Sequence, residues 1–300
     1  MAQKSEEATM SQVRKAVMPA AGMGTRFLPA TKAIPKEMLP IVDKPIIQYV
    51  VEEAVESGFK NIAFVTSRGK SAIENHFDYD FHLEQYLLQQ CKPELVDVVN
   101  ELSRKISFTS VMQEQPLGLG HAVLVAQSFV EEEAFGVFLG DDIVLSEIPC
   151  MRQLLDVYET CQASVLAVQE VPPESVSRYG VVAVESAGDS GNCIFKVLDA
   201  IEKPSAEEAP SNLAIIGRYV LTPGVFPALM KTAPGSGGEI QLTDAIQRLL
   251  QEEPVYACQF KGCRYDAGNK LEYLKATVEF ALQREDLQED FQNYLKQLKV

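Results

Sequence analysis

The stretch Ala20-Ala21-Gly22-Met23-Gly24-Thr25-Arg26-Phe27-Leu28-Pro29 follows a short apolar run, Ala16-Val17-Met18, that is typical of a buried strand. Pro35-Lys36-Glu37-Met38-Leu39-Pro40 comes closely after it. Two glycines in a loop after a strand let the backbone turn tightly and bring N–H groups against an anion. Arg26 and Lys36 add two cations. Because open α/β sheets bind ligands at the carboxyl ends of their strands, we expect this loop to form a triphosphate-binding site there.

Two familiar phosphate-binding loops do not match this sequence. A dinucleotide fingerprint needs a third glycine three residues after the second, and Phe27 occupies that position. A P-loop needs a glycine five residues before its Gly-Lys-Ser, but Phe64 stands at that distance before Gly69-Lys70-Ser71. We therefore interpret Gly69-Lys70-Ser71 as the start of a helix.

Strand-like runs alternate with helical periods through the first half of the chain. That alternation is typical of βαβ units and predicts an α/β fold with a mixed, mostly parallel, doubly wound sheet flanked by helices. The expected strands are Ala16–Met18, Asn61–Thr66, Ile106–Met112 and Ala134–Leu139, and the expected helices are Pro45–Ser57, a stretch through Gln90, and Gly120–Phe129.

The second half contains strands with short connections, which predict mixed or antiparallel pairing beside the main sheet. The last segment, Lys270–Leu298, has a helical period and many charges, so it is either a packed terminal helix pair or a subunit contact. The other expected strands are Ser164–Glu170, Gly180–Glu185, Cys193–Ala200, Leu213–Leu221 and Val255–Gln259, and the other helices are Pro223–Lys231 and Gln241–Glu252.

Composition excludes several classes of partner and site. The net charge of −15 argues against nucleic acid or an anionic membrane as the main partner. Six cysteines at irregular spacings form no Cys-x-x-Cys pair, so neither a zinc site nor a disulfide framework is supported. We find no signal-peptide pattern and no apolar run long enough to span a membrane, and we expect a cytoplasmic protein.

A second glycine-containing loop, residues 113–123, reads Gln-Glu-Gln-Pro-Leu-Gly-Leu-Gly-His-Ala-Val and joins an expected strand to an expected helix. Gly118 and Gly120 permit close approach of the backbone to a ligand. The carboxamide of Gln113 can donate and accept in one plane, which suits an imide edge such as uracil N3–H with its carbonyls. An ordinary strand-to-helix turn explains the same residues, so both interpretations stay open.

Two aspartates are candidate metal ligands. Asp141 follows the expected strand Ala134–Leu139, beside the phosphate loop. A carboxylate there is placed to hold Mg²⁺, which takes few protein carboxylates and keeps substrate phosphates among its ligands. Asp266, within Arg264-Tyr265-Asp266-Ala267-Gly268-Asn269, is the second candidate. A turn or helix-cap role is the alternative for Asp141.

The second half carries candidate contacts to a sugar. Glu202-Lys203-Pro204 follows the strand Cys193–Ala200. A glutamate can accept hydrogen bonds from paired sugar hydroxyls and a lysine supplies a point charge for a phosphate, although a surface salt bridge explains the same pair. Gly180 and Gly217 lie beside aromatic and β-branched residues, where a glycine either lets a sugar ring pass the backbone or forms a β-bulge.

Together these segments resemble the bacterial UTP–glucose-1-phosphate uridylyltransferases (UDP-glucose pyrophosphorylases) of the sugar nucleotidyltransferase family. The resemblance runs from about residue 12 to 285, and the joint occurrence is specific although no single segment is. The segments, in the family's order, are Gly22–Pro29, Pro35–Pro40, Pro116–Ala122, Glu202–Pro204 and Glu239–Asp244.

The resemblance implies a glycosyltransferase-A-like nucleotidyltransferase fold. This fold is a Rossmann-like mixed sheet flanked by helices, with a sugar-binding part built from additional short strands. We expect a flexible tail over residues 1–12, then one domain over residues 13–285. Residues 13–145 of that domain mainly bind nucleotide, residues 146–268 mainly bind sugar, and the C-terminal helices in 270–300 are a candidate subunit contact.

The resemblance also assigns roles to individual residues. The backbone of Ala20, Ala21 and Gly22, with Gln113 and Gly118, holds the uracil. Arg26 and Lys36 hold the phosphates, Asp141 and Asp266 hold Mg²⁺ against the substrate, Gly180, Glu202 and Gly217 contact the hexose, and Lys203 contacts its phosphate. Met112 departs from the family, which commonly has a basic residue there, and is expected to weaken phosphate or base contacts slightly. Met23 stands at a position that varies within the family.

The activity implied is Mg²⁺-dependent, in-line conversion of UTP and α-D-glucose 1-phosphate to UDP-glucose and pyrophosphate, by a homodimer or homotetramer. The nearer alternative is the same chemistry with dTTP, CTP or another sugar 1-phosphate. The second alternative is a non-catalytic nucleotide-sugar-binding or regulatory protein. Such a protein is expected to lack Asp141, Asp266 or Lys203, and all three are present. We expect no nucleic-acid or membrane partner.

Overall fold

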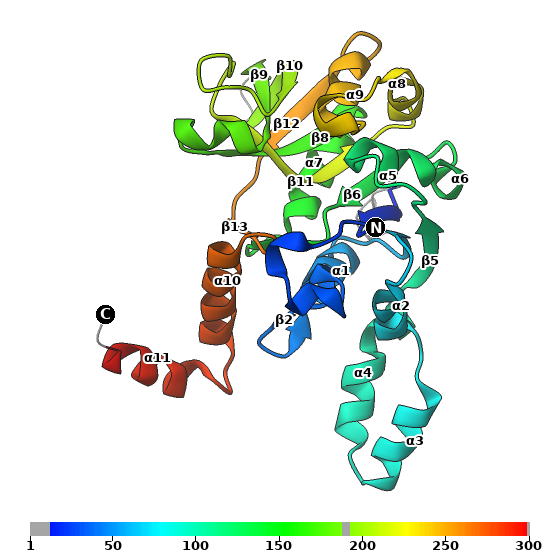
Figure 1. Cartoon of the computed structure of the whole chain (residues 1–300), viewed down its shortest axis with the longest axis vertical. Helices are drawn as coiled ribbons and strands as arrows, with labels where there is room; N and C mark the ends of the chain where they lie inside the picture. Colours follow the sequence, from blue (N-terminus) through cyan, green and yellow to red (C-terminus); the bar gives the residue numbers. More distant parts are fainter. Residues whose placement is uncertain (1–12, 188–192, 299–300) are drawn as a thin grey trace, which may run out of the picture.

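The computed structural model describes residues 13–187 and 193–298, so the tail expected over residues 1–12 lies outside the described residues. The larger strands are β1 (Lys15–Pro19), β4 (Asn61–Thr66), β5 (Ser107–Met112), β6 (Phe135–Phe138), β8 (Ser164–Glu170), β9 (Gly180–Ser186), β10 (Ile194–Glu202), β11 (Leu213–Leu221) and β12 (Val255–Gln259). They form a nine-stranded sheet in the order β5-β4-β1-β6-β11-β8-β12-β10-β9 (Figure 1).

Two small sheets lie outside this one. One pairs β2 (Pro40–Ile41) with β3 (Lys44–Pro45), and the other pairs β7 (Asp142–Leu145) with β13 (Cys263–Asp266). The helices are α1 (Ile46–Glu56), α2 (Ser71–Phe77), α3 (Phe81–Gln89), α4 (Pro93–Lys105), α5 (Leu119–Val125), α6 (Gln127–Val130), α7 (Cys150–Cys161), α8 (Val225–Lys231), α9 (Leu242–Leu249), α10 (Lys270–Gln283) and α11 (Gln288–Gln297).

The mixed sheet with flanking helices is confirmed, but its parallel part is confined largely to the first half. The pairs β5–β4, β4–β1, β1–β6 and β8–β12 are parallel. The pairs β6–β11, β11–β8, β12–β10 and β10–β9 are antiparallel. The strands of the second half extend the same sheet instead of standing beside it. Short connections such as the one between β9 and β10 bring the chain back antiparallel, which a parallel crossover cannot do.

Alternating side chains of the central strands supply two hydrophobic cores. Val17 and Val65 point to the core beneath α5, α8 and α9, while Met18 and Phe64 point to the core beneath α1, α2 and α7. This two-residue period is the geometry of a strand buried on both faces. The sheet therefore carries helices on both sides and leaves its strand ends free for a site.

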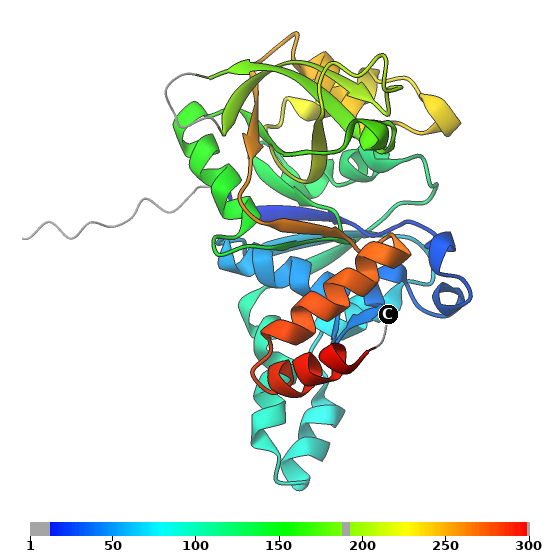
Figure 2. The same ribbon diagram turned by 90° about the vertical axis from the view of Figure 1, so that its left-hand side faces the viewer.

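Several parts of the fold were not expected from the sequence. The helix α4 pairs with α3 in a hairpin that projects from the body, and α7 covers one face of β8 and β11 (Figures 1 and 2). The strands β7 and β13 are four residues long and lie about 120 positions apart in the chain, so local pattern gives no sign of their pairing. No helix in the described ranges combines the length and apolar character that a membrane span requires.

Candidate active site

Two adjoining cavities open where β1, β5 and β6 end. The first, of about 280 Å³, is lined from the loops after these strands, and the second, of about 410 Å³, from β9, β10, β11 and β13. Leu119, Leu139, Asp141 and Glu239 line both. A ligand that filled both cavities would therefore pass Asp141.

The structure brings nearly all of the expected site residues to these cavities. The first cavity is lined by Ala21, Gly22, Lys36, Gln113, Gly118 and Asp141. The second is lined by Arg26, Asp141, Gly180, Glu202, Lys203, Gly217 and Asp266. Ala20 is the exception, because it lines neither cavity and is 1% exposed beneath the loop.

A buried lysine holds the loop from below. Lys70 Nζ donates a hydrogen bond to the carbonyl of Ala20 and lies 3.1 Å from Glu37 Oε2. Burial lowers the pKa of Lys70 although the charge of Glu37 opposes it, and burial raises the pKa of Glu37. The helix α2 does begin at Ser71, as expected, but no pattern in the sequence indicates that the preceding lysine turns inward.

Lys36 and Asp141 form an ion pair at the junction of the two cavities. The Lys36 Nζ to Asp141 Oδ2 distance is 2.5 Å. Burial by itself would raise the pKa of Asp141, but the Lys36 charge and hydrogen bond outweigh burial and hold that pKa below its usual range. Burial likewise opposes the charge of Lys36, and Asp141 with Glu37 raises its pKa overall. Both groups are thus charged at neutral pH.

Asp141 and Asp266 converge on Gly268. A Cβ atom on Gly268 would stand 2.6 Å from Asp141 Oδ2 and 2.9 Å from Asp266 Oδ1, so the two carboxylates lie against one bare Cα. Burial, and then the charge of Asp142, raise the pKa of Asp266. In the described ranges no group of three or more histidine, cysteine or acidic ligands gathers. Two carboxylates beside the glycine loop that follows β1 fit Mg²⁺, an ion that takes few protein carboxylates and completes its ligand set with phosphates and water.

Gln113 lies at the wall of the first cavity and is 5% exposed. Its Nε2 donates to the carbonyl of Gly118 at 3.1 Å and lies 3.0 Å from His121 Nδ1. Gly118 has a φ of +96°, which favours glycine, and a Cβ there would stand 2.9 Å from the Ile240 carbonyl. The loop that contains Gly118 is thus closed against the segment before α9.

In the second cavity, Glu202 is held at the end of β10. Thr243 Oγ1 donates to Glu202 Oε2 at 2.7 Å, and Lys203 Nζ lies 3.3 Å from Glu202 Oε1. Lys203 has a φ of +48°, a region that non-glycine residues seldom adopt, and its N–H donates to the Tyr179 carbonyl. A Cβ on Gly180 would stand 2.5 Å from Thr243 Oγ1. The position therefore requires glycine for this close approach.

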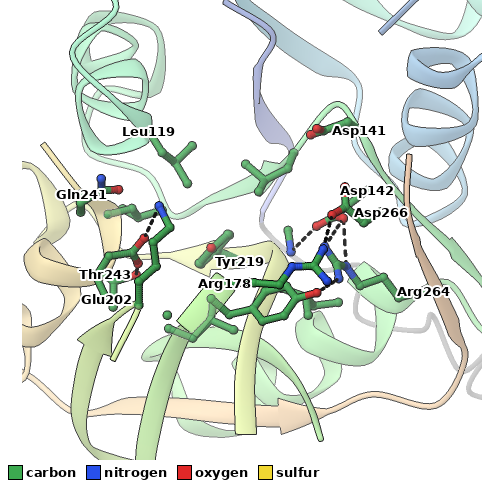
Figure 3. Close-up of a pocket in the computed structure, with 18 of the residues that line it drawn as sticks. Leu119, Asp141, Asp142, Arg178, Glu202, Tyr219, Gln241, Thr243, Arg264 and Asp266 are labelled. Atoms are coloured by element: carbon green, nitrogen blue, oxygen red, sulfur yellow. Dashed lines mark hydrogen bonds and ion pairs between the residues drawn. The ribbon is translucent and has the colours of Figure 1, made fainter. Parts of the chain in front are cut away.

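Asp142 and Arg264 form a charged cluster on the opposite wall (Figure 3). Arg264 Nη2 lies 2.5 Å from Asp142 Oδ1, and the N–H of Gly217 donates to Asp142 Oδ2 at 3.0 Å. Arg178 Nη2 lies 3.6 Å from Asp266 Oδ2. From the sequence, Arg264 stood only as a neighbour of Asp266, and neither Asp142 nor Arg178 was expected at a site, because the pairing of β7 with β13 creates this cluster.

A fully buried ion pair supports the turn that carries Asp141. Arg218 is 0% exposed, and its Nη2 lies 2.7 Å from Glu53 Oε2 and donates to the Asp142 carbonyl at 2.7 Å. The same guanidinium donates to the carbonyls of Leu139 and Gly217. This pair joins α1 to β11 and fixes the turn from both sides.

The helix α10 braces the segments that follow β1. The Tyr273 hydroxyl donates to the Pro40 carbonyl at 2.6 Å, and its ring meets Phe27 edge-on at a centroid distance of 5.4 Å. Ala276 packs in one cluster with Ile41 and Tyr265. The last third of the chain thus supports both Arg26, next to Phe27, and Asp266, next to Tyr265.

Met112 does not line either cavity. It is 50% exposed and lines a separate hollow with Glu114, Gln115, Leu117, His121 and Val125. Because Met112 and Gln113 are neighbours at the end of β5, their side chains point to opposite sides. The structure therefore gives no direct way for Met112 to weaken contacts to the base, which was the expectation from the sequence.

Comparison with known proteins places the chain in a family. The nucleotidyl transferase family matches residues 15–283. UTP–glucose-1-phosphate uridylyltransferases of Bacillus subtilis (strain 168) and Streptococcus pneumoniae serotype 4 are each 50% identical, over 96% of this chain and 98% and 97% of their own lengths.

Solved structures agree with this placement. The UTP-bound UGPase of Acinetobacter baumannii has a TM-score of 0.88 at 42% identity, over 96% of this chain and 100% of that one. A UDP-glucose pyrophosphorylase complexed with UDP-glucose has a TM-score of 0.83 at 42% identity, over 91% of this chain and 100% of that one. The chain therefore belongs to the nucleotidyl transferase family, in the group of the UTP–glucose-1-phosphate uridylyltransferases.

Proposed function

We propose that this protein transfers the uridylyl group of UTP to the phosphate of glucose 1-phosphate, giving UDP-glucose and pyrophosphate. The observation that carries the proposal is the pair of cavities that meet at Asp141, one with a phosphate loop and a buried amide, the other with Glu202 and Lys203. Relatives that are 50% identical over 96% of this chain carry this activity in their names. Residues 13–145 supply most of the first cavity, and residues 146–268 most of the second, as nucleotide and sugar halves.

In this proposal the reaction needs no general base. The phosphate of glucose 1-phosphate has a second pKa of about 6, so it is mostly dianionic at pH 7. One of its oxygens forms a bond to the α-phosphorus of UTP, while the bond from that phosphorus to the β-phosphate oxygen breaks and pyrophosphate leaves with the electron pair. The obstacle is the repulsion between two polyanions, which positioned cations reduce.

The cations of the site are divided between the two substrates. Arg26 is exposed at the edge of the second cavity and Lys36 lies at the junction, so we assign both to the triphosphate. We assign Lys203 to the phosphate of the sugar and Glu202 to hydroxyls of the hexose. Holding both reactants in line lowers the barrier further, because the reaction becomes effectively intramolecular.

Asp141 and Asp266 would hold Mg²⁺, because their carboxylates converge on Gly268 and phosphates would complete the ligand set. When bound, Mg²⁺ neutralises charge on the phosphates and orients them. Lys36 is paired with Asp141 in the structure, and we expect it to turn toward a phosphate when substrate enters.

The test is pyrophosphate release from the purified protein with glucose 1-phosphate and Mg²⁺, across UTP, dTTP, CTP, ATP and GTP. We expect release with UTP, abolished by EDTA. Release with another nucleotide in preference to UTP would leave the chemistry intact and change the substrate. No release with any nucleotide or any sugar 1-phosphate, together with measurable UDP-glucose binding, would support a binding protein instead.

We further propose a homodimer or homotetramer in the cytoplasm. All six cysteines are free, which fits a reducing compartment.

Leu271 and Leu274 on α10 are 61% and 60% exposed, so residues 270–300 are our candidate subunit contact. The α3–α4 hairpin also exposes apolar side chains, including Phe81 and Val98. Light scattering of Leu271→Glu and, separately, Val98→Glu distinguishes the two surfaces, because only the true contact loses the oligomer.

A further inference from the structure

The amide of Gln113 has both of its N–H groups directed to acceptors inside the protein. A primary amide has two N–H donors and one oxygen. Its Nε2 has two acceptors within reach, the Gly118 carbonyl at 3.1 Å and His121 Nδ1 at 3.0 Å. In the described part of the chain no group donates to Gln113 Oε1. That oxygen is also not one of the fully buried, unpartnered atoms, which are Ser57 Oγ and Gln169 Oε1. The oxygen is thus the atom that Gln113 offers to a ligand in the first cavity.

The two acceptors also decide which way round the amide stands. The Gly118 carbonyl can only accept, so an inverted amide would set two oxygens against each other. His121 Nδ1 accepts only when its ring proton is on Nε2, so this hydrogen bond selects one tautomer of the neutral ring. With both N–H groups engaged, Gln113 faces the cavity as an acceptor and not as a donor.

Gly118 and His121 are supported by one closed loop. The N–H of Gly120 donates to the Ile240 carbonyl at 2.8 Å, and the N–H of Ile240 donates to the Leu117 carbonyl at 2.7 Å. A Cβ on Gly120 would stand 2.7 Å from the Ile240 carbonyl, so the two segments are in close contact. The loop cannot shift either acceptor without breaking these hydrogen bonds.

We propose that His121 is a positioning residue for base selection, which acts by taking the second N–H of Gln113. The inference rests on the proposed function of this site. An amide that offers only its oxygen binds a ring N–H such as uracil N3–H and repels the N3 lone pair of cytosine. Without the His121 acceptor, the amide keeps one anchor and can turn an N–H into the cavity. Discrimination between uracil and cytosine then falls.

The test compares two substitutions that differ in where they place an oxygen. In His121→Asn the side-chain oxygen can stand where Nδ1 stands, because both atoms are bonded to Cγ. In His121→Gln the amide reaches the position of Nε2 instead, and His121→Leu has no acceptor. The readout is the ratio of kcat/KM for UTP to kcat/KM for CTP, with pyrophosphate release as the assay. His82→Leu, on the exposed face of α3, is the matched control.

We expect His121→Leu and His121→Gln to lower the UTP:CTP ratio about 10-fold or more, mainly through the KM for UTP, the scale of one lost specific hydrogen bond. His121→Asn should keep the ratio within about threefold of wild type, as should His82→Leu. An unchanged ratio in the Leu and Gln variants, or an equal loss for both nucleotides, overturns the proposal.

The failure of this inference can be told apart from the failure of the proposed function. If the wild-type protein releases no pyrophosphate, the function fails, and calorimetric binding of UTP and CTP to the same variants tests His121 by the same ratio. If His121→Leu does not fold, His121→Gln against His121→Asn decides the question. In that pair, equal UTP:CTP ratios contradict a positioning role.

Discussion

The two cavities hold their polar groups in different ways. In the first, the Lys36–Asp141 pair stands at the junction, and the remaining wall combines glycine-containing loops, the Gln113 amide and the carboxylates of Glu37 and Glu239. These loops are closed by backbone hydrogen bonds such as Gly120 to Ile240. In the second, charged side chains from separate strands meet, with Asp142 on β7 and Arg264 on β13. Both cavities contain charged groups, but the first depends more on where the loop backbone can pass and the second more on the balance of charge.

At the junction between the cavities, both the backbone and the charges matter. Asp141 lies in a turn whose carbonyls are held by Arg218, and Arg218 is paired with Glu53 in the core. A charged group at the cavity is thus fixed by a second charged pair that no ligand reaches. Four experiments, in order of decreasing expected effect, separate these contributions.

The largest effect is expected from breaking the buried pair that joins the two regions. Glu53→Leu leaves the fully buried guanidinium of Arg218 without its charge partner, which costs about 3–5 kcal/mol in the free energy of unfolding. Urea denaturation followed by circular dichroism measures the loss. Arg104→Leu removes an exposed ion pair with Asp97 and should change stability by no more than about 0.5 kcal/mol. Equal stability of the two variants would contradict a central role for the pair.

Asp141→Asn tests the junction itself. The substitution removes the charge that pairs with Lys36 and that we assign to Mg²⁺, so kcat should fall by about 10²–10³. The Mg²⁺ concentration for half-maximal rate should also rise. The assay is UDP-glucose formation at varied Mg²⁺, with Asp97→Asn as the exposed control. A variant with normal rate and an unchanged Mg²⁺ requirement would remove Asp141 from the site.

Lys203→Ala tests the electrostatic character of the second cavity. We expect turnover to fall by about 10² or more, the scale of one positioned charge, because no other cation there is assigned to the sugar phosphate. Lys196→Ala is the matched control, since Lys196 lies on β10, the strand that ends just before Lys203, and the two side chains are 49% and 53% exposed. Steady-state rates of both variants suffice. Near-normal turnover of Lys203→Ala would contradict its assigned role.

The smallest effects sharpen the contrast between the two cavities. Gly118→Ala would place a Cβ 2.9 Å from the Ile240 carbonyl, and Gly180→Ala would place one 2.5 Å from Thr243 Oγ1. Each should raise a KM about 10-fold, for UTP in the first variant and for glucose 1-phosphate in the second.

Gly58→Ala is the control for backbone strain, because its φ is +97° and nothing lies within 4 Å of its added Cβ. Initial-rate measurements with one substrate varied at a time give the two KM values. If both substitutions raised the same KM, the division of the cavities between two substrates would be wrong.

The sequence predicted the elements that have a strong local pattern. Asn61–Thr66 and Ser164–Glu170 were expected as strands with the bounds that the structure shows. Their apolar runs are long enough to bury both faces of a central strand, and burial dominates their stability. The segments β7 and β13 were missed because a four-residue strand has too short a pattern, and their partners are distant in the chain.

The same division holds for the site residues. Gly22, Lys36 and Gly118 lie in loops whose glycines and cations indicate a ligand-binding site, and all three line the first cavity. Lys70 and Arg218 gave no comparable signal. Their contacts to Ala20, Glu37 and Glu53 depend on how α1, α2 and β11 pack in three dimensions, and a local sequence pattern does not show this packing.

The sequence by itself determined the alternation of strands and helices and the loops that could bind phosphate, because burial and backbone freedom act over a few residues. Only the tertiary structure decided which charges face one another. Asp141 meets Lys36 across 105 positions, and Arg264 meets Asp142 across 122. Coulombic attraction depends on distance in space and on the surrounding dielectric, and local sequence fixes neither.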